Sequence, residues 1–311
     1  MPHFIEQHGD PQIPPPYSFP NVTIHSFRLA ANMGTLTELC NARLNIGKGE
    51  KRGFEYRPIL PFVDLEVLHY PRMVSANPRF NYGWLTQREC YFRLLVGRYD
   101  LTAGGPVPAE AAVFIPYIFV DNPWSVVCGR EVVGFPKVMA SITTPNSETG
   151  ETGRLYPIRV STDVFEQYSA KSNQCGCPIV EIEDSQLGLA SEEVPKGTIW
   201  PWGVFNPRTI DPALLPYLQD RSRFSTIQLK QIRDAQESEI ACYQALIHAE
   251  FAVDRMDLKS LTAAEITIPR YDSLRIEQEL GLMGETLQPL WQYSVVCDLK
   301  YGNVRNLFVN V

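Results

Sequence analysis

The sequence predicts a mainly β protein in which short strands form an antiparallel barrel or a sandwich. Two observations support this prediction. The 311 residues include 25 prolines and 20 glycines, which divide the chain into short segments. Those segments are rich in β-branched and aromatic residues, as strands are. Because they follow one another closely, antiparallel pairing is favoured over βαβ units, which need long helical crossovers.

The predicted strands share a high content of Val, Ile, Phe and Tyr, and turn residues bound them. They cover residues 57–71, 89–100, 110–121, 225–234 and 290–302, together with the second half of 231–251. Gly, Asn and Pro at the bends predict hairpin turns within 97–108 and 143–158.

Helix signals are few. Residues 34–45 place Leu36, Leu39 and Cys40 near one face, with Thr35 as the expected N-cap. Residues 271–282 form the second candidate, with Ser273 as N-cap and Gly281 as the C-terminal stop. The fold class is therefore mainly β with a minor helical component.

Composition limits the domain organisation and the partners. We expect an extended N-terminal arm over residues 1–20 and a single domain over 21–311. The net charge of −7, without basic runs, argues against nucleic acid as a partner. No apolar stretch approaches the roughly 18 residues of a membrane helix, and the first residues do not form a secretory signal. We expect a cytoplasmic protein that does not bind membranes.

Seven cysteines are spread along the chain, and two of them form the pair Cys175-Gly-Cys177. A zinc site would need a matching Cys or His pair elsewhere, which the sequence does not contain. We therefore expect this pair to form a structural turn, without a metal and without an obligatory disulfide.

Lys137 is a lysine within an apolar run, "GREVVGFPKVMASI" (129–142). If the run is buried, the amine loses its hydration and the neutral form is favoured. A neutral amine attacks carbonyl carbons and forms a Schiff base, which withdraws electrons from the neighbouring carbon chain. The alternative is a lysine at a strand edge whose stem packs while its ammonium reaches water.

The wider motif "VDNPWSVVCGREVVGFPKVMASI" (120–142) resembles the acetoacetate decarboxylase family. In that family a polar turn leads into Gly-Arg-Glu, a short apolar spacer and then an aromatic residue, proline and lysine. The counterparts here are Asp121-Asn122, Gly129-Arg130-Glu131 and Phe135-Pro136-Lys137. Acetoacetate decarboxylase is itself the standard example of a lysine activated by its surroundings. The resemblance therefore implies that Lys137 is the catalytic nucleophile.

The resemblance also implies a fold and two further catalytic residues. The fold would be a closed antiparallel β-barrel wrapped by additional strands, with few helices, usually assembled as a homo-oligomer. Glu66 and Glu89 fall where the family has carboxylates near the lysine. Glu89 is expected to transfer protons; the alternative is a surface ion pair with Arg88 or Arg93. Glu66 is expected to support it; the alternative is a solvated strand residue.

The sequence departs from the decarboxylase at two positions. A second lysine follows the Schiff-base lysine in the decarboxylase, whereas Val138 stands here. Burial would then have to keep the Lys137 amine neutral without repulsion from a neighbouring cation. An arginine that helps to bind the substrate carboxylate aligns with Val22, and we expect Arg28 to take its place.

The remaining site residues are assigned by type and position. Tyr117 and Trp124 are expected to line the substrate pocket, although aromatic residues in strands are more often core. Arg130 and Glu131 are expected to give structural support to the turn before Lys137, through a buried ion pair. HExxH, GxSxG and Gly-rich phosphate-loop motifs do not occur, so we expect neither a metal nor a cofactor.

Three functions remain open from the sequence. The first is a Schiff-base-forming lyase that decarboxylates a β-keto acid. The second is an aldolase-dehydratase or a related condensation on an α-keto acid through the same lysine, which Val138 favours slightly. The third is a non-catalytic barrel that binds a small ligand. In the first two cases the partner is a small keto acid.

Overall fold

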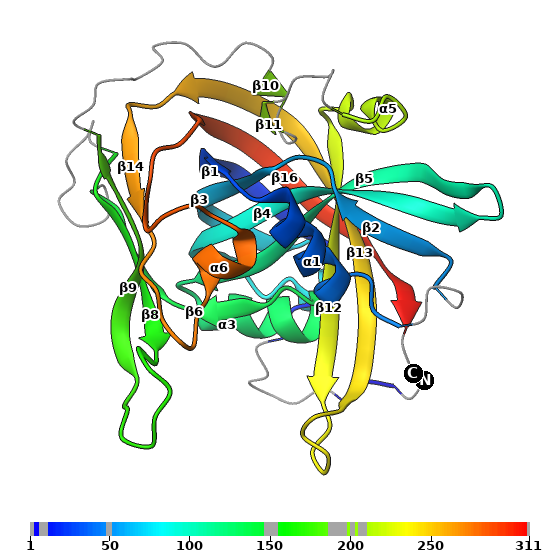
Figure 1. The fold of residues 1–311 in the computed structure, drawn as a ribbon, viewed down its shortest axis with the longest axis horizontal. Coiled ribbons are helices and arrows are strands. Elements are labelled where there is room, and N and C mark those ends of the chain that lie inside the picture. Colours follow the sequence, from blue (N-terminus) through cyan, green and yellow to red (C-terminus); the bar gives the residue numbers. More distant parts are fainter. Residues whose placement is uncertain are drawn as a thin grey trace.

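The structure is a computed structural model that describes residues 3–5, 12–47, 52–145, 155–185, 198–199, 203–204 and 210–309. Strands make up most of this part of the chain and the helices are short, as the sequence predicted (Figure 1). The predicted hairpin at 97–108 is confirmed as the turn between β4 (Leu85–Thr102) and β5 (Gly105–Val120). Part of the turn predicted at 143–158 lies outside the described residues.

The main sheet closes on itself. Its strand order is β2-β4-β3-β1-β16-β13-β12-β5-β6, and an additional pairing between β4 and β5 joins seven of these strands into a ring. The ring strands are β1 (Tyr17–Ala30), β3 (Phe62–Ser75), β4 (Leu85–Thr102), β5 (Gly105–Val120), β12 (Arg223–Arg233), β13 (Ala241–Ser260) and β16 (Trp291–Val309). Outside the ring, β2 (Phe54–Pro58) pairs with β4, and β6 (Lys137–Met139) pairs with β5.

The expectation of purely antiparallel pairing is wrong at two places. β12 and β6 each pair with β5 in parallel. Parallel neighbours need a long connection, and more than a hundred residues separate β5 from β12. The predicted single strand 57–71 is also divided, because β2 ends at Pro58 and β3 begins after Pro61.

A second, five-stranded sheet lies beside the ring (Figure 1), with the order β15-β14-β9-β8-β7. Its strands are β7 (Ser141–Thr143), β8 (Ile158–Val164), β9 (Cys175–Asp184), β14 (Ala264–Thr267) and β15 (Thr286–Leu287). A short pair, β10 (Thr198–Ile199) and β11 (Gly203–Val204), forms a separate sheet. Because β7 follows β6 almost directly, the second sheet begins next to Lys137.

The alternation of side chains along the ring strands produces two cores. Residues such as Ile24, Leu68 and Val113 belong to one buried cluster, which also contains residues that line the ring interior. Residues such as Phe27 and Val67 belong to the other cluster, together with residues of the second sheet and of helix α1 (Met33–Arg43). The ring therefore has a packed outer face, while its interior is available for a site.

The two predicted helices are present but are capped differently. α1 (Met33–Arg43) begins at Asn32, whose side chain accepts a hydrogen bond from the Thr35 backbone N–H. α6 (Ile276–Leu280) ends at Gly281, as predicted, in the left-handed conformation that glycine favours. Ser273 does not cap α6; its hydroxyl accepts from the Phe165 backbone N–H at 2.8 Å. Two short helices, α3 (Pro123–Val127) and α5 (Leu215–Leu218), were not predicted.

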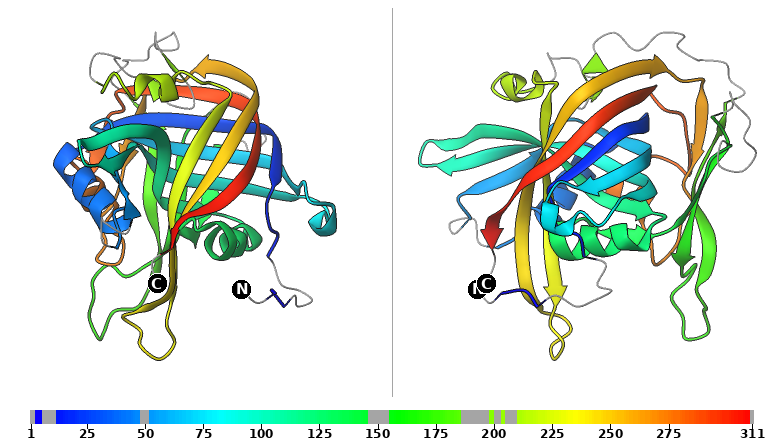
Figure 2. Two further views of the ribbon diagram at one scale, coloured as in Figure 1. Left: turned by 90° about the vertical axis from the view of Figure 1, so that its right-hand side faces the viewer. Right: turned by 180° about the vertical axis from the view of Figure 1, so that it is seen from behind.

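The N-terminal arm is shorter than expected, because β1 already begins at Tyr17. Residues 12–14, before β1, contact other parts of their own chain. The Ile13 backbone N–H lies 3.1 Å from the Cys128 sulfur, and Ser75 donates a hydrogen bond to the Pro14 carbonyl. The left view of Figure 2 shows the described segment just before β1 descending below the ring.

Cys175 and Cys177 were expected to form a structural turn without an obligatory disulfide, and the structure instead places them on a strand with their sulfurs bonded. The two sulfurs are joined in a disulfide at the start of β9. Residues two apart on a strand point to the same face, and Gly176 between them leaves the backbone free to bring the two Cα atoms to 5.4 Å.

Among the residues described, no helix combines the length and the apolar character that crossing a bilayer demands.

Candidate active site

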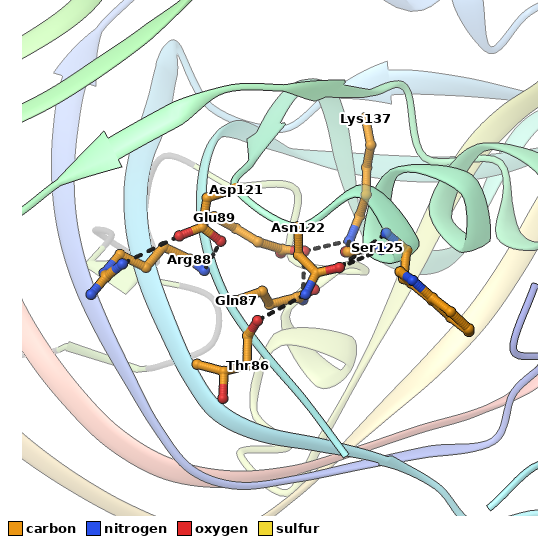
Figure 3. Close-up of polar contacts among 9 residues, drawn as sticks. Thr86, Gln87, Arg88, Glu89, Asp121, Asn122, Ser125 and Lys137 are labelled. Atoms are coloured by element: carbon orange, nitrogen blue, oxygen red, sulfur yellow. Dashed lines mark hydrogen bonds and ion pairs between the residues drawn. The ribbon is translucent and has the colours of Figure 1, made fainter. Parts of the chain in front are cut away.

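The Lys137 side chain lies in the interior of the molecule, and only 8% of the residue is exposed. Its amine donates a hydrogen bond to the Ser125 hydroxyl oxygen at 2.7 Å and forms an ion pair with a carboxylate oxygen of Glu89 (Figure 3). Lys137 is the first residue of β6, opposite Ile118 of β5. The short strand therefore directs the lysine toward β4, where Glu89 lies.

The segment before Lys137 leaves room for its stem. Residues Cys128–Val133 form a π-helical turn that ends at Gly134, which has φ 82°. A Cβ atom on Gly129 would lie only 2.4 Å from Cδ of Lys137 and 2.8 Å from its Cε. The glycine of the Gly-Arg-Glu motif is therefore explained by the space that the lysine occupies.

The polar pair at the start of the motif attaches this segment to β4. The Asn122 side chain caps α3 by accepting from the backbone N–H groups of Trp124 and Ser125, and it donates to the Thr86 carbonyl at 3.0 Å. Asp121 accepts from the Arg88 backbone N–H at 2.7 Å. These bonds place Ser125 next to β4 and close to Lys137 (Figure 3).

Glu89 lies in a row of alternate β4 residues, Gln87, Glu89, Tyr91 and Arg93, that all line one cavity. Gln87 donates its amide N–H to Glu89 at 3.0 Å, and the Tyr70 hydroxyl of β3 also hydrogen-bonds this carboxylate. Burial first, and the Glu89 charge second, raise the pKa of Tyr70 far above its ordinary value, so Tyr70 stays a neutral donor. Glu89 pairs with Lys137 and not with Arg88, whose partner is Asp121.

Glu66 of β3 lies in the same cavity and is fully buried. Its carboxylate accepts from the Tyr91 hydroxyl at 2.6 Å and forms an ion pair with Arg93 at 2.8 Å. Loss of hydration on burial raises the pKa of Glu66, although Arg93 and Tyr91 act against this. Glu66 is therefore not the solvated strand residue of the alternative interpretation.

The cavity encloses about 70 Å³, roughly half the 150 Å³ of a cavity that holds benzene. One wall carries the charged and polar groups around Lys137. The other walls include rings of Tyr17, Phe19, Phe135, Phe224, Phe251 and Tyr301. Such a site fits a small molecule with one polar end.

Three residues expected in the substrate pocket lie elsewhere. Arg28 is buried, but its guanidinium makes a bidentate ion pair with Asp64 at 2.7 and 2.9 Å. This pair lies one row of side chains beyond Glu66, and Arg28 does not line the cavity. Tyr117 packs against the outer core and hydrogen-bonds Glu279. Trp124 is 37% exposed on α3.

Arg130 and Glu131 do not form the expected buried ion pair, since both side chains are exposed. Arg130 donates to the Lys137 carbonyl at 3.2 Å, and Glu131 accepts from Gln12 of the arm. Val138, at the position of the family's second lysine, is 37% exposed. Consecutive strand residues face opposite sides, so Val138 points away from the cavity.

Sequence reasoning missed Ser125, Gln87, Tyr70, Tyr91 and Arg93. A signal existed for the β4 residues, because Gln87, Tyr91 and Arg93 keep the period of two with Glu89. Ser125 lies within the quoted motif but twelve residues before Lys137, and only the turn of the chain through α3 joins them.

No group of potential metal ligands is found at the cavity in the part of the chain that the structure describes. Among the described residues, the candidate group consists of Glu166, Cys175 and Cys177, which lie at the β8–β9 hairpin and not at the cavity. Near Lys137, the carboxylates of Glu89 and Glu66 are already paired with cations.

The fold and the site together define the class of this protein. It is a ring of strands with a lysine amine, paired with a carboxylate, in a buried cavity. The chain belongs to the acetoacetate decarboxylase family, because the sequence profile described as Acetoacetate decarboxylase (ADC) matches residues 1–164 of the 311. Membership of this family suggests a lyase. No curated protein matches the chain.

Solved structures support the fold over nearly the whole chain. An acetoacetate decarboxylase from Legionella pneumophila subsp. pneumophila str. Philadelphia 1 is similar with a TM-score of 0.58 and 12% identity, over 99% of this chain and 92% of that one. An acetoacetate decarboxylase-like enzyme from Sphingomonas wittichii RW1 gives 0.54 and 11%, over 94% and 92%. The enduracididine biosynthesis enzyme MppR gives 0.50 and 12%, over 96% and 90%.

Proposed function

We propose that this protein is a Schiff-base-forming lyase that decarboxylates a small β-keto acid through Lys137. The observation that carries the proposal is the position of the Lys137 amine, buried in a small cavity between the Glu89 carboxylate and the Ser125 hydroxyl. A lysine serving only to pack its stem would place its ammonium in water. Family membership supports the same chemistry.

The contact between Lys137 and Glu89 supplies the first proton transfer. Glu89 takes a proton from the ammonium, and the neutral amine attacks the ketone carbon to form a carbinolamine. Glu89 then returns its proton to the departing hydroxyl, so that water leaves and an iminium ion remains. This cycle needs a carboxylate in direct contact with the amine, which is the arrangement around Glu89.

The iminium ion accepts the electrons of the bond that breaks. When the bond to the carboxylate cleaves, carbon dioxide leaves and the electron pair forms an enamine with a neutral nitrogen. Protonation of the enamine carbon and addition of water then release the ketone and the free amine. Glu66 is suited to hold a proton for this step, because burial raises the pKa of its carboxyl.

Neighbouring side chains keep the reacting groups in position. Ser125 accepts a hydrogen bond from the amine, and Gln87 and Tyr70 hold the Glu89 carboxylate. Arg93 takes the role we expected of Arg28 toward the substrate carboxylate, because it lines the cavity and Arg28 does not. We propose that Arg130 supports Lys137 through its carbonyl.

An aldolase-dehydratase reaction on an α-keto acid is the second candidate. Val138 favours it, because the decarboxylase proper has a lysine at this position. Both reactions begin with the same Schiff base and differ in which bond of the iminium species is made or broken. A non-catalytic barrel that binds a small ligand would make no covalent adduct.

The test treats the protein with borohydride in the presence of a keto acid and then maps the modified peptide. The keto acids are acetoacetate, pyruvate alone, and pyruvate together with an aldehyde. We expect an adduct on Lys137 and carbon dioxide release from acetoacetate. Lys137→Ala and Lys137→Arg should abolish both, since a guanidinium stays protonated. Lys259→Ala, which removes an exposed lysine, is the control. An adduct on another lysine, or turnover by Lys137→Ala, contradicts the proposal.

We further propose a homo-oligomer, on the strength of the family resemblance. Sedimentation at micromolar concentration measures this directly. A mass near that of one 35.2 kDa chain would contradict it.

A further inference from the structure

A second cluster of reactive side chains lies away from the lysine cavity, on the β8–β9 hairpin. The disulfide between Cys175 and Cys177 lies at the start of β9, and Glu166 lies just after the end of β8. One carboxylate oxygen of Glu166 is 3.9 Å from each of the two sulfurs. None of these residues lines the lysine cavity, so the proposed function does not use them.

The cluster is accessible. Glu166 is exposed, and both cysteines are partly exposed at the edge of the outer core. Figures 1 and 2 show the hairpin projecting away from the ring, with β8 and β9 in green. A small thiol in solution can therefore reach the disulfide without any opening of the fold.

A structural role explains this disulfide poorly. A disulfide stabilises a protein mainly by restricting the unfolded chain, and this effect is smallest when the closed loop is short. Here a single residue, Gly176, separates the two cysteines. The hairpin strands are already joined by backbone pairs, including Thr162 with Cys177 and Val164 with Cys175.

The short separation instead favours chemistry at the sulfurs. Once one sulfur has been captured by an external thiol, the other is held beside it and displaces that thiol intramolecularly. A carboxylate next to both sulfurs can accept the proton of a thiol and return it to a departing thiolate. Glu166 occupies that position for either sulfur.

We propose that Cys175, Cys177 and Glu166 form a thiol–disulfide exchange site for small thiols of the glutathione class. One external thiol gives its proton to Glu166 and its sulfur attacks a sulfur of the pair, the Cys175–Cys177 bond breaks, and Glu166 returns the proton to the departing sulfur. A second external thiol then attacks the sulfur of the first, the bond from that sulfur to the protein breaks, and the departing protein sulfur takes up the proton of the second thiol. The products are two protein thiols and one external disulfide, and oxidised glutathione drives the reverse reaction.

The experiment uses the full chain equilibrated with glutathione buffers of defined ratios of reduced to oxidised form, then alkylated and peptide-mapped. We expect Cys175 and Cys177 to change together by two electrons, reversibly. Cys242 is the matched control, because it is the exposed free cysteine among those described. Cys242→Ser should leave the transition unchanged. Cys177→Ser should accumulate a mixed disulfide between glutathione and Cys175, because the resolving sulfur is absent.

The role of Glu166 is tested separately by kinetics. Glu166→Gln should leave the disulfide content unchanged and slow exchange by about tenfold or more. The part of the pH dependence of the exchange rate that the carboxylate causes should be lost. Glu181→Gln, at a carboxylate on the same strand β9 that pairs with Arg159, is the control.

Two results would overturn the proposal. One is a pair that stays oxidised, or stays reduced, over the whole range of buffers while Cys242 reacts normally. The other is zinc that remains bound stoichiometrically to the reduced chain and is lost on changing any of the three residues, since the cluster would then be a metal site.

Discussion

Glu89 receives three different donors: the Lys137 amine, the Gln87 amide and the Tyr70 hydroxyl. The two neutral donors keep the carboxylate in one orientation, so that a proton moved between Lys137 and Glu89 does not require either group to move. Such preorganisation is worth most in a buried site, where water does not compete for the same hydrogen bonds.

Replacing Glu89 by Gln should slow turnover by roughly 10²–10⁴-fold, because the amide cannot accept the proton that Lys137 must lose. The borohydride-reduced adduct with the keto acid should still form, but more slowly, since the amine remains and only its proton acceptor is lost. Steady-state rates and trapping are measured on the same samples. Glu277→Gln, at a buried carboxylate outside the cavity, is the control. Turnover within twofold of the unmodified protein would exclude Glu89 as the proton carrier.

At the scale of elements, the segment from α3 to β6 works as one unit. Asp121 and Asn122 attach its beginning to β4, the π-helical turn carries it past the lysine stem, and the pairing of β6 with β5 holds its end. The position of the amine therefore depends on backbone geometry as much as on its own contacts.

Gly129→Ala should reduce activity strongly while the protein stays folded. The new Cβ would meet Cγ, Cδ and Cε of Lys137 within 3 Å, and the flexible lysine stem is the part that must shift. Displacing the amine from Glu89 and Ser125 should lower both turnover and trapping. Gly104→Ala, in the open turn between β4 and β5, should change neither. Full activity in Gly129→Ala would show that the stem has other room.

Val138→Lys tests the missing second lysine of the family. The residue is on the opposite face of β6 from Lys137, so a lysine there should extend into water. An exposed charge is well screened, and we expect the acidic limb of the pH–rate profile to move by less than about half a unit. A larger shift toward low pH would mean that the two amines interact through the sheet.

For the whole molecule, ring closure places charged residues in a buried interior, and their pairing offsets the cost of burying charge. Across β1, β3 and β4, Arg28 pairs with Asp64, which also contacts Arg93, and Arg93 contacts Glu66. These ion pairs connect the cavity to the deeper part of the ring. Groups without such partners respond differently to pH.

His25 on β1 has no hydrogen-bond partner at its Nδ1 among the described residues, and burial lowers its pKa to about 4. The unfolded chain takes up a proton near pH 6.5, whereas the folded protein does so only near pH 4. Stability is therefore full above pH 6.5 and falls as the pH decreases toward 4, by at most about 1.4 kcal/mol per pH unit. Urea unfolding at pH 7 and pH 5 should show a smaller loss in His25→Gln; parallel losses would contradict this assignment.

Much of the site was visible in the sequence, because its chemistry is concentrated in one motif. Lys137, Gly129 and the polar pair 121–122 are close in the chain, and Glu89 and Glu66 lie in recognisable strands. Arg28 was misjudged for a geometric reason. Its side chain is on the face of the strand that points into the ring, but it lies one row of side chains deeper than the residues that line the cavity. The period of a strand predicts the face of a residue and not its depth.

By itself, the sequence determined that the protein is mainly β, that a helix lies near residues 34–45, and that a lysine lies in an apolar run. These are local properties, set by composition, spacing and turn residues over short stretches. Only the tertiary structure decided that β4 meets β5 to close the ring, that Ser125 and Glu89 converge on Lys137, and that Cys175 and Cys177 are bonded. Each of these depends on residues brought together by chain reversals, strand register or backbone bending, which no local pattern specifies.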